Sequence, residues 1–96
     1  MTHDAIADTL EAELIHRQFR VRHALADTTD SRYVIAYFEI GDDELSHDFT
    51  IRIADHDATH HYDSCIRTDR LDIGQQVREA LHDAECFKSK QETAYA

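Results

Sequence analysis

The densest group of side chains able to do chemistry lies in a polar segment between residues 55 and 63, rich in histidine and aspartate. Imidazole and carboxylate groups are ordinary ligands of zinc, manganese and nickel. His56 and His60 are four residues apart and would share a face in a helical turn. The sequence contains no His-Glu-x-x-His motif and no CxxC pair. We therefore interpret the segment as a solvated polar loop. The alternatives are a metal-binding module that uses His56, His60, His61 and a nearby Asp, and a pH-sensitive surface.

A second chemical candidate is a cysteine nucleophile, because Cys65 follows these histidines closely. A reactive thiolate needs a helix start or a stable positive neighbour. The segment around Cys65 is acidic, and it contains no glycine that could form an oxyanion hole. The sequence therefore predicts that the protein is not an enzyme and uses no cofactor, and that Cys65 and Cys86 are free thiols.

Carboxylates dominate the chain, which has 20 acidic and 10 basic residues and a formal net charge of −10. One set, Asp4, Asp8 and Glu11, falls on a line along a predicted helix, opposite its apolar stripe. A second set surrounds the predicted turns, at Asp27, Asp30, Asp42, Asp43 and Glu44. Such arrays resemble a phosphate backbone in charge and steer a protein towards grooves rich in arginine and lysine. The alternatives are a solvated face and adaptation to high salt.

Apolar periodicity predicts a helix near each end of the chain. Ile6, Leu10 and Leu14 recur every four residues, which indicates a helix from Asp4 to about Arg17. A longer stripe indicates a second helix from Asp72 to about Phe87, and its members are Ile73, Val77, Ala80, Leu81, Ala84 and Phe87. Asp72 and Gln75 resemble a capping box at its start. We expect one domain over residues 1–88 and a frayed C-terminal tail over 89–96.

Alternation with a period of two predicts strands between the helices. They are Phe19–Leu25, Arg32–Ile40, His47–Ala54 and a short fourth strand, Ser64–Thr68. The second strand is largely apolar on both faces, which favours a central position in the sheet. Short turns join consecutive strands, so we expect antiparallel pairing. The sequence thus predicts a two-layer α+β domain of order α-β-β-β-(β)-α, with an antiparallel sheet and both helices packed on one face.

The face of the sheet without helices would carry tyrosine and arginine side chains. Its predicted members are Arg20, Arg22, Tyr33, Ile35, Tyr37, Thr50 and Arg52. Tyrosine and arginine are typical of hot spots in protein interfaces, so Tyr33 and Tyr37 are candidate anchors for a partner. A third layer that covers this face is the alternative interpretation.

Direct binding of nucleic acid is not expected. The element order is shared with double-stranded-RNA-binding domains, but those domains use a basic start to the last helix. Here that helix begins Asp72-Ile73-Gly74-Gln75-Gln76, and a net charge of −10 repels phosphate. The chain has no apolar run long enough for a membrane span, and Met1 to Glu13 lacks the pattern of a secretory signal. The predicted location is the cytoplasm.

These features predict a small acidic protein-interaction module, an inhibitor that occupies a basic, nucleic-acid-binding surface of a partner protein. In size and charge the chain is similar to small phage-encoded inhibitors, including anti-CRISPR proteins; this is an analogy of class that no motif carries. The alternatives are the metal-binding module and a salt-adapted protein that self-associates, with a homodimer formed through the open sheet face.

Overall fold

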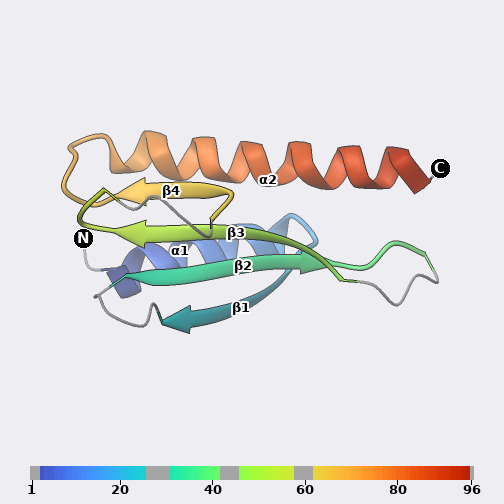
Figure 1. Cartoon of the computed structure of the whole chain (residues 1–96), viewed down its shortest axis with the longest axis horizontal. Coiled ribbons are helices and arrows are strands. Elements are labelled where there is room, and N and C mark those ends of the chain that lie inside the picture. Colours follow the sequence, from blue (N-terminus) through green and yellow to red (C-terminus); the bar gives the residue numbers. More distant parts are fainter. Residues whose placement is uncertain (1–2, 26–30, 42–45, 58–61, 96) are drawn as a thin grey trace.

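In the computed structural model, the described residues are 3–25, 31–41, 46–57 and 62–95, and they form two helices and four strands. In chain order the elements are α1 (His3–His16), β1 (Arg20–Leu25), β2 (Arg32–Phe38), β3 (His47–Ala54), β4 (Ser64–Arg67) and α2 (Ile73–Tyr95) (Figure 1). Each of the predicted elements is present, with ends that differ by a few residues, except at the end of α2.

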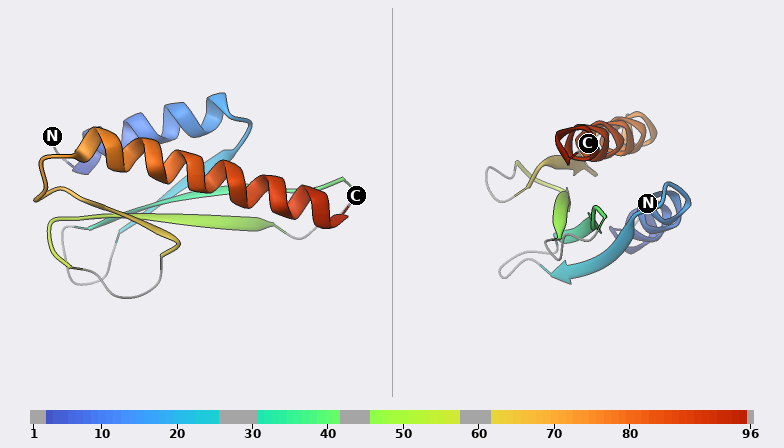
Figure 2. Two further views of the ribbon diagram at one scale, coloured as in Figure 1. Left: turned by 90° about the horizontal axis from the view of Figure 1, so that it is seen from above. Right: turned by 90° about the vertical axis from the view of Figure 1, so that its right-hand side faces the viewer.

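The strands form one open sheet in the order β1-β2-β3-β4, and both helices lie on the same face of it (Figure 2). α1 packs mainly on β1 and β2, and α2 packs on β3 and β4. The predicted α+β class, with two helices on one face of the sheet, is therefore confirmed.

The core lies between the sheet and the helices. Ile6, Leu10 and Leu14, the predicted stripe of α1, have no exposed surface. The inward positions of the strands and of α2 complete the core, and they are Val34, Ala36, Phe38, Phe49, Ile51, Ile53, Ile66, Ala80, Leu81 and Ala84. The alternation predicted for β2 and β3 thus describes which side chains point towards the helices.

β4 pairs parallel to β3, with Ile51 opposite Ser64 and Ala54 opposite Arg67. The sheet is therefore mixed rather than wholly antiparallel. The connection over residues 55–63 returns the chain to the level of Ile51 instead of reversing it in a tight turn. Only a short return is needed because β4 has four residues. A parallel neighbour normally requires a long crossover, which is why the sequence favoured the antiparallel arrangement.

α2 continues to Tyr95, well beyond the end expected near Phe87, so residues 89–95 are helical. Residues 88–95 contain no glycine or proline and are mostly good helix formers. The extension is also tied to the core through Lys88. Its ammonium donates to the Gln18 carbonyl at 3.0 Å and lies 5.0 Å from the centre of the Phe19 ring.

α1 ends in a reversal at Gln18, whose φ is 69°. The Phe19 N–H donates to the Leu14 carbonyl at 3.0 Å, and the Gln18 N–H donates to the Ile15 carbonyl at 3.0 Å. This pair of bonds is the Schellman pattern, which satisfies carbonyls at a helix end and places the next residue against the helix. Phe19 is consequently buried, and the chain enters β1 directly beneath α1.

Candidate protein-interaction surface

The sheet face opposite the helices, which we call the open face, is built by side chains that the strand register brings together. Arg20 is opposite Tyr37, Arg22 is opposite Ile35, and Tyr33 is opposite Arg52. Paired residues project to the same side of a sheet. The residues predicted for this surface therefore do share one face, namely Arg20, Arg22, Tyr33, Ile35, Tyr37, Thr50 and Arg52.

Each tyrosine of the open face lies against an arginine of a neighbouring strand. The guanidinium carbon of Arg22 is 5.6 Å from the centre of the Tyr37 ring, and that of Arg52 is 5.4 Å from the centre of the Tyr33 ring. Arg52 also donates from Nη1 to the Tyr33 hydroxyl at 3.1 Å. Guanidinium groups within about 6 Å of a ring centre are attracted to its face. Both rings are therefore held in place on the sheet, and both are half-buried.

Two arginines of the open face are paired with carboxylates on the same face. Arg22 Nη2 lies 2.8 Å from Asp48 Oδ2, and Arg20 Nη1 lies 3.9 Å from Glu39 Oε1. The Ser46 hydroxyl donates to the other oxygen of Asp48 at 2.8 Å. Exposed pairs of this kind add little stability, but they cancel charge. This part of the open face thus presents the Tyr37 ring beside two paired arginines rather than a basic surface for phosphate.

Arg52 differs from these two arginines, since no described carboxylate pairs with it. Its nitrogens Nη1 and Nη2 donate to the hydroxyls of Tyr33 and Ser31, at 3.1 and 3.3 Å. Its Nε is buried and has no hydrogen-bond partner among the described residues. Arg52 is opposite Cys65 in the parallel pairing of β3 and β4. Burial raises the pKa of the Cys65 thiol, and the positive charges of Arg52 and Arg67 offset this only in part. The thiol is therefore held in its protonated, weakly nucleophilic form.

The carboxylates of α1 lie on the flank of the helix that faces β1 and β2. Asp4 Oδ1 lies 2.9 Å from Arg32 Nε, and Glu11 Oε2 lies 3.4 Å from His23 Nε2. Asp8 is exposed, and no basic side chain of the described part pairs with it. The predicted line of carboxylates thus exists, but its two ends are engaged by the sheet and only Asp8 is left open.

Several candidate residues lie outside the described part of the chain. They are the turn carboxylates Asp27, Asp30, Asp42, Asp43 and Glu44, and the loop histidines His60 and His61. Their roles stay predictions.

The described part of the histidine-rich segment contains an imidazole–carboxylate pair. His56 Nδ1 lies 2.9 Å from Asp55 Oδ1, and this hydrogen bond lowers the pKa of the Asp55 carboxyl. Within residues 3–25, 31–41, 46–57 and 62–95, no three metal-ligating side chains come together. A site that also uses His60 and His61 stays a prediction.

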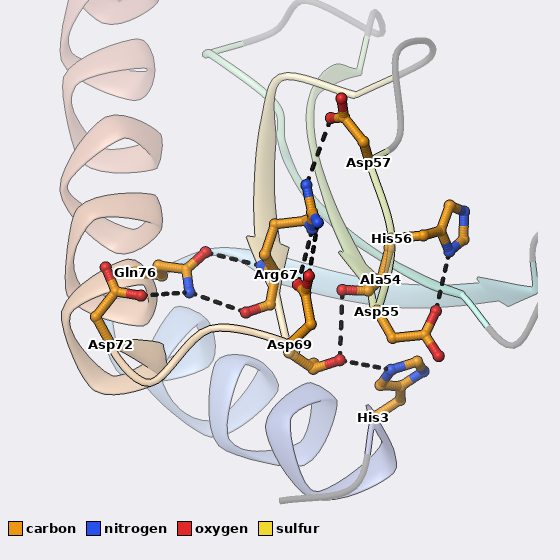
Figure 3. A network of polar contacts seen from close by, with 10 residues as sticks. His3, Ala54, Asp55, His56, Asp57, Arg67, Asp69, Asp72 and Gln76 are labelled. Carbon is orange, nitrogen blue, oxygen red and sulfur yellow. Dashed lines mark hydrogen bonds and ion pairs between the residues drawn. The ribbon is translucent and has the colours of Figure 1, made fainter.

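A polar network at the start of α2 holds the outer side of β4 (Figure 3). The Gln76 side chain accepts from the Arg67 N–H at 2.8 Å and donates to the Arg67 carbonyl at 3.0 Å. It also donates to the Asp72 carboxylate at 3.1 Å. The sequence pointed to Gln75 as the capping partner of Asp72. The signal for Gln76 was its polar side chain within the buried stripe of α2.

The Arg67 side chain gathers two carboxylates on the same network. Its Nε and Nη2 bind both oxygens of Asp69, at 2.9 and 2.7 Å, and its Nη1 lies 3.5 Å from Asp57. The hydrogen bonds from Arg67 lower the pKa of the Asp69 carboxyl. These contacts join the end of β4 to the segment that follows β3, so they fix the short parallel strand in place.

No protein-family model matches the chain, and neither the curated proteins nor the solved structures include a significant match. Among the described helices, none combines the length and the apolar character that a membrane span needs.

Proposed function

We propose that the protein is a small, non-enzymatic interaction module that occupies a basic, nucleic-acid-binding surface of a partner protein and thereby inhibits it. The observation that carries this proposal is the open face, on which Tyr33 and Tyr37 are each held beneath an arginine. Side chains fixed before binding lose little freedom on association. Tyrosine and arginine are also the residue types that most often supply binding energy at interfaces.

The excess negative charge gives the proposed partner its chemistry. Several exposed carboxylates, Asp8, Asp83 and Glu92 among them, have no basic partner among the described residues. A net charge of −10 attracts a basic groove and raises the rate of encounter with it. The same charge repels free nucleic acid, so the protein and a nucleic acid would compete for the groove. The analogy with small acidic phage-encoded inhibitors rests on this charge and on size.

The experiment begins with the full chain immobilised on a resin and a cell lysate applied at about 0.05 M salt, where surface charges are weakly screened. Captured proteins are eluted with rising salt, identified and purified. We expect them to be nucleic-acid-binding proteins that duplex DNA or RNA displaces from the resin. The double variant Tyr33→Thr/Tyr37→Thr should weaken binding by about thirtyfold, a loss typical of interface anchors.

The matched control is Glu79→Gln, which removes an exposed charge from α2 on the other side of the sheet. It should leave the affinity of the captured protein within about twofold, as expected for a distant surface charge. Threonine is well tolerated in strands, and urea unfolding of the double variant checks that it is folded. Binding that is insensitive to salt, to competing nucleic acid, or to the loss of both tyrosines contradicts the proposal.

A further inference from the structure

The two edges of the sheet are built differently. At one edge, β4 is covered by α2, and the Gln76 amide makes both backbone hydrogen bonds of Arg67 that a further strand would make. At the other edge, β2 is the one neighbour of β1 among the described strands (Figure 1). An edge of this kind presents unpaired N–H and C=O groups, which are a template for another strand. The edge at β1 is thus available for pairing, while the edge at β4 is capped at Arg67 by the Gln76 side chain.

A groove runs between the free edge and α1. It has a volume of about 570 Å³, and it is lined by Asp4, Ala7, Asp8, His23, Ala24, Leu25 and Arg32. In Figure 2, α1 lies along the helix side of β1 and leaves the outer edge of that strand uncovered. Leu25 faces this groove and is 67% exposed, although its place in the strand alternation makes it an inward position. The groove therefore offers an apolar side chain next to unpaired backbone.

The charge of the groove is negative at its centre. Asp4 and Glu11 are already engaged by Arg32 and His23, while Asp8 projects between them with no basic partner in the described part of the chain. A side chain in a new strand beside His23 would point to this same side of the sheet. Because His23 contacts Glu11, a longer basic side chain at that place would come within reach of the carboxylates of α1.

We propose that β1 adds an extended segment of the partner protein as a fifth strand, and that this segment carries the pattern apolar-x-basic-x-apolar. Its apolar residues would pack beside Leu25 and Val21, and its lysine or arginine would lie beside His23 and reach Asp8. Successive residues on one face of a strand are about 6.7 Å apart, so one basic residue falls midway between the two apolar ones. The pattern reads the same in both directions and thus suits either strand polarity. The basic character of the occupant rests on the proposed function.

The test uses a blocked synthetic heptapeptide, Thr-Val-Thr-Arg-Thr-Val-Thr, and the full chain labelled with ¹⁵N. We expect binding to protect alternate amides of β1 from hydrogen exchange, because those amides gain strand partners. A peptide with Glu in place of Arg should bind at least about fivefold more weakly, as expected when a partly exposed ion pair is replaced by repulsion. Binding that leaves the exchange of the β1 amides unchanged, or absence of binding at millimolar peptide, overturns the proposal.

Two methylated peptides separate strand addition from simple charge attraction. One carries N-methyl groups on its two valines and its arginine. The other carries them on its threonines, which occupy the intervening positions. The N–H groups of alternate residues in a strand point to opposite edges, so only one peptide should lose affinity, by about tenfold or more. Equal effects of the two modifications contradict a backbone-paired complex.

Matched protein variants locate the charge. Asp8→Asn should weaken binding of the arginine peptide by about fivefold. The variant should then bind the arginine and glutamate peptides equally well. Asp83→Asn removes a carboxylate of α2 that is also exposed and should have no effect. Equal losses in the two variants would mean that net charge, rather than this groove, attracts the peptide.

Two further outcomes distinguish this inference from the proposed function. If the peptide fails at β1 while the tyrosine variant loses the captured partner, only the strand addition is wrong. If the peptide protects β1 but no basic partner is captured, only the proposed function is wrong.

β1 itself reads Val21-Arg22-His23-Ala24-Leu25, so a second copy is the competing occupant. Concentration-dependent association that protects β1 without peptide would overturn the proposal in favour of that copy.

Discussion

The side chain of Arg52, in β3, contacts β2 and lies beside β4 in the sheet. It lies over the Tyr33 ring of β2, donates to the hydroxyl of Ser31 next to that strand, and is opposite Cys65 of β4. Its partners are neutral, so its positive charge is not cancelled by a described carboxylate as the charges of Arg20 and Arg22 are. Arg52 is therefore the residue at which the electrostatics of the open face can be measured, with the Cys65 thiol as the reporter.

We predict that alkylation of Cys65 has a pH midpoint above that of free cysteine, because burial raises the thiol pKa more than Arg52 and Arg67 lower it. Arg52→Gln should move the midpoint higher still, since it removes a positive charge. Arg20→Gln is the control, because β1 lies about 14 Å from β4 across the sheet. The rate of iodoacetamide labelling, followed by mass spectrometry in a Cys86→Ser background, measures the midpoint.

The same shift fixes the sign of the effect on stability. The folded state holds the Cys65 proton more tightly than the unfolded state does, so the thiol contributes no pH dependence below its unfolded pKa. Stability then falls as the pH rises from the unfolded pKa through the folded one. A labelling midpoint at or below that of free cysteine in the folded protein would show that the arginine charges outweigh burial.

At the scale of elements, the contrast between the two sheet edges depends on Gln76. Its amide completes the backbone of Arg67 much as a neighbouring strand would, which caps the sheet edge at that residue. Natural proteins commonly protect edge strands in such ways, since an open edge pairs with other chains. The protection of β4 leaves β1 as the edge through which the protein could associate by strand pairing.

We predict that Gln76→Ala lowers the free energy of unfolding by about 2 kcal/mol, because it leaves the N–H and C=O of Arg67 without their protein partners. Gln75→Ala is a matched control, since Gln75 is exposed and its side chain donates to the exposed Glu79. The change in helix propensity is identical in the two variants and cancels in the comparison. Urea unfolding measures both, and the control should stay within about 0.5 kcal/mol of the parent. Equal losses would show that the network of Gln76 does not stabilise the edge.

Elements with a strong apolar period could be predicted from the sequence, and elements without one could not. The stripe of α1 and the alternation of β2 and β3 decide both the type of element and the buried face, because burial of those side chains drives folding. β4 has four residues and too little pattern to specify its direction, which depends on the path of residues 55–63. The end of α2 has no apolar stripe, so its helical state follows from propensity and from the contacts of Lys88.

The candidate surface divides in the same way. Tyr33 and Tyr37 could be placed on the open face because side chains alternate along β2. Their arginine partners depend on register, and the carboxylate that pairs with Arg22 could not be assigned without it. The free edge at β1 was missed because Leu25 has the alternation of a buried residue. It is nonetheless 67% exposed and lines the groove between β1 and α1.

At the scale of the whole molecule, the dimensions of the protein are comparable to the distance over which its charges interact at low salt. The chain measures 40 × 26 × 21 Å and carries a net charge of −10. The Debye length falls from about 20 Å at 0.02 M salt to about 3 Å at 1 M. At low salt, carboxylates on different elements therefore repel one another across much of the molecule. At high salt, only directly paired groups interact.

We predict that salt acts in opposite directions on folding and on partner binding. Screening relieves the repulsion among unpaired carboxylates, so Tm should rise by about 5 °C between about 0.02 M and about 1 M salt, which corresponds to roughly 1 kcal/mol in a domain of this size. The protein should nonetheless be folded at the lower salt, because its core is apolar. Binding to the captured basic partner should weaken by at least about a hundredfold over the same range, because attraction between opposite charges is screened.

A salt-adapted, self-associating protein would instead unfold at low salt and gain both stability and mass as salt rises. Thermal unfolding and light scattering on the same samples, combined with the binding titration, separate these outcomes.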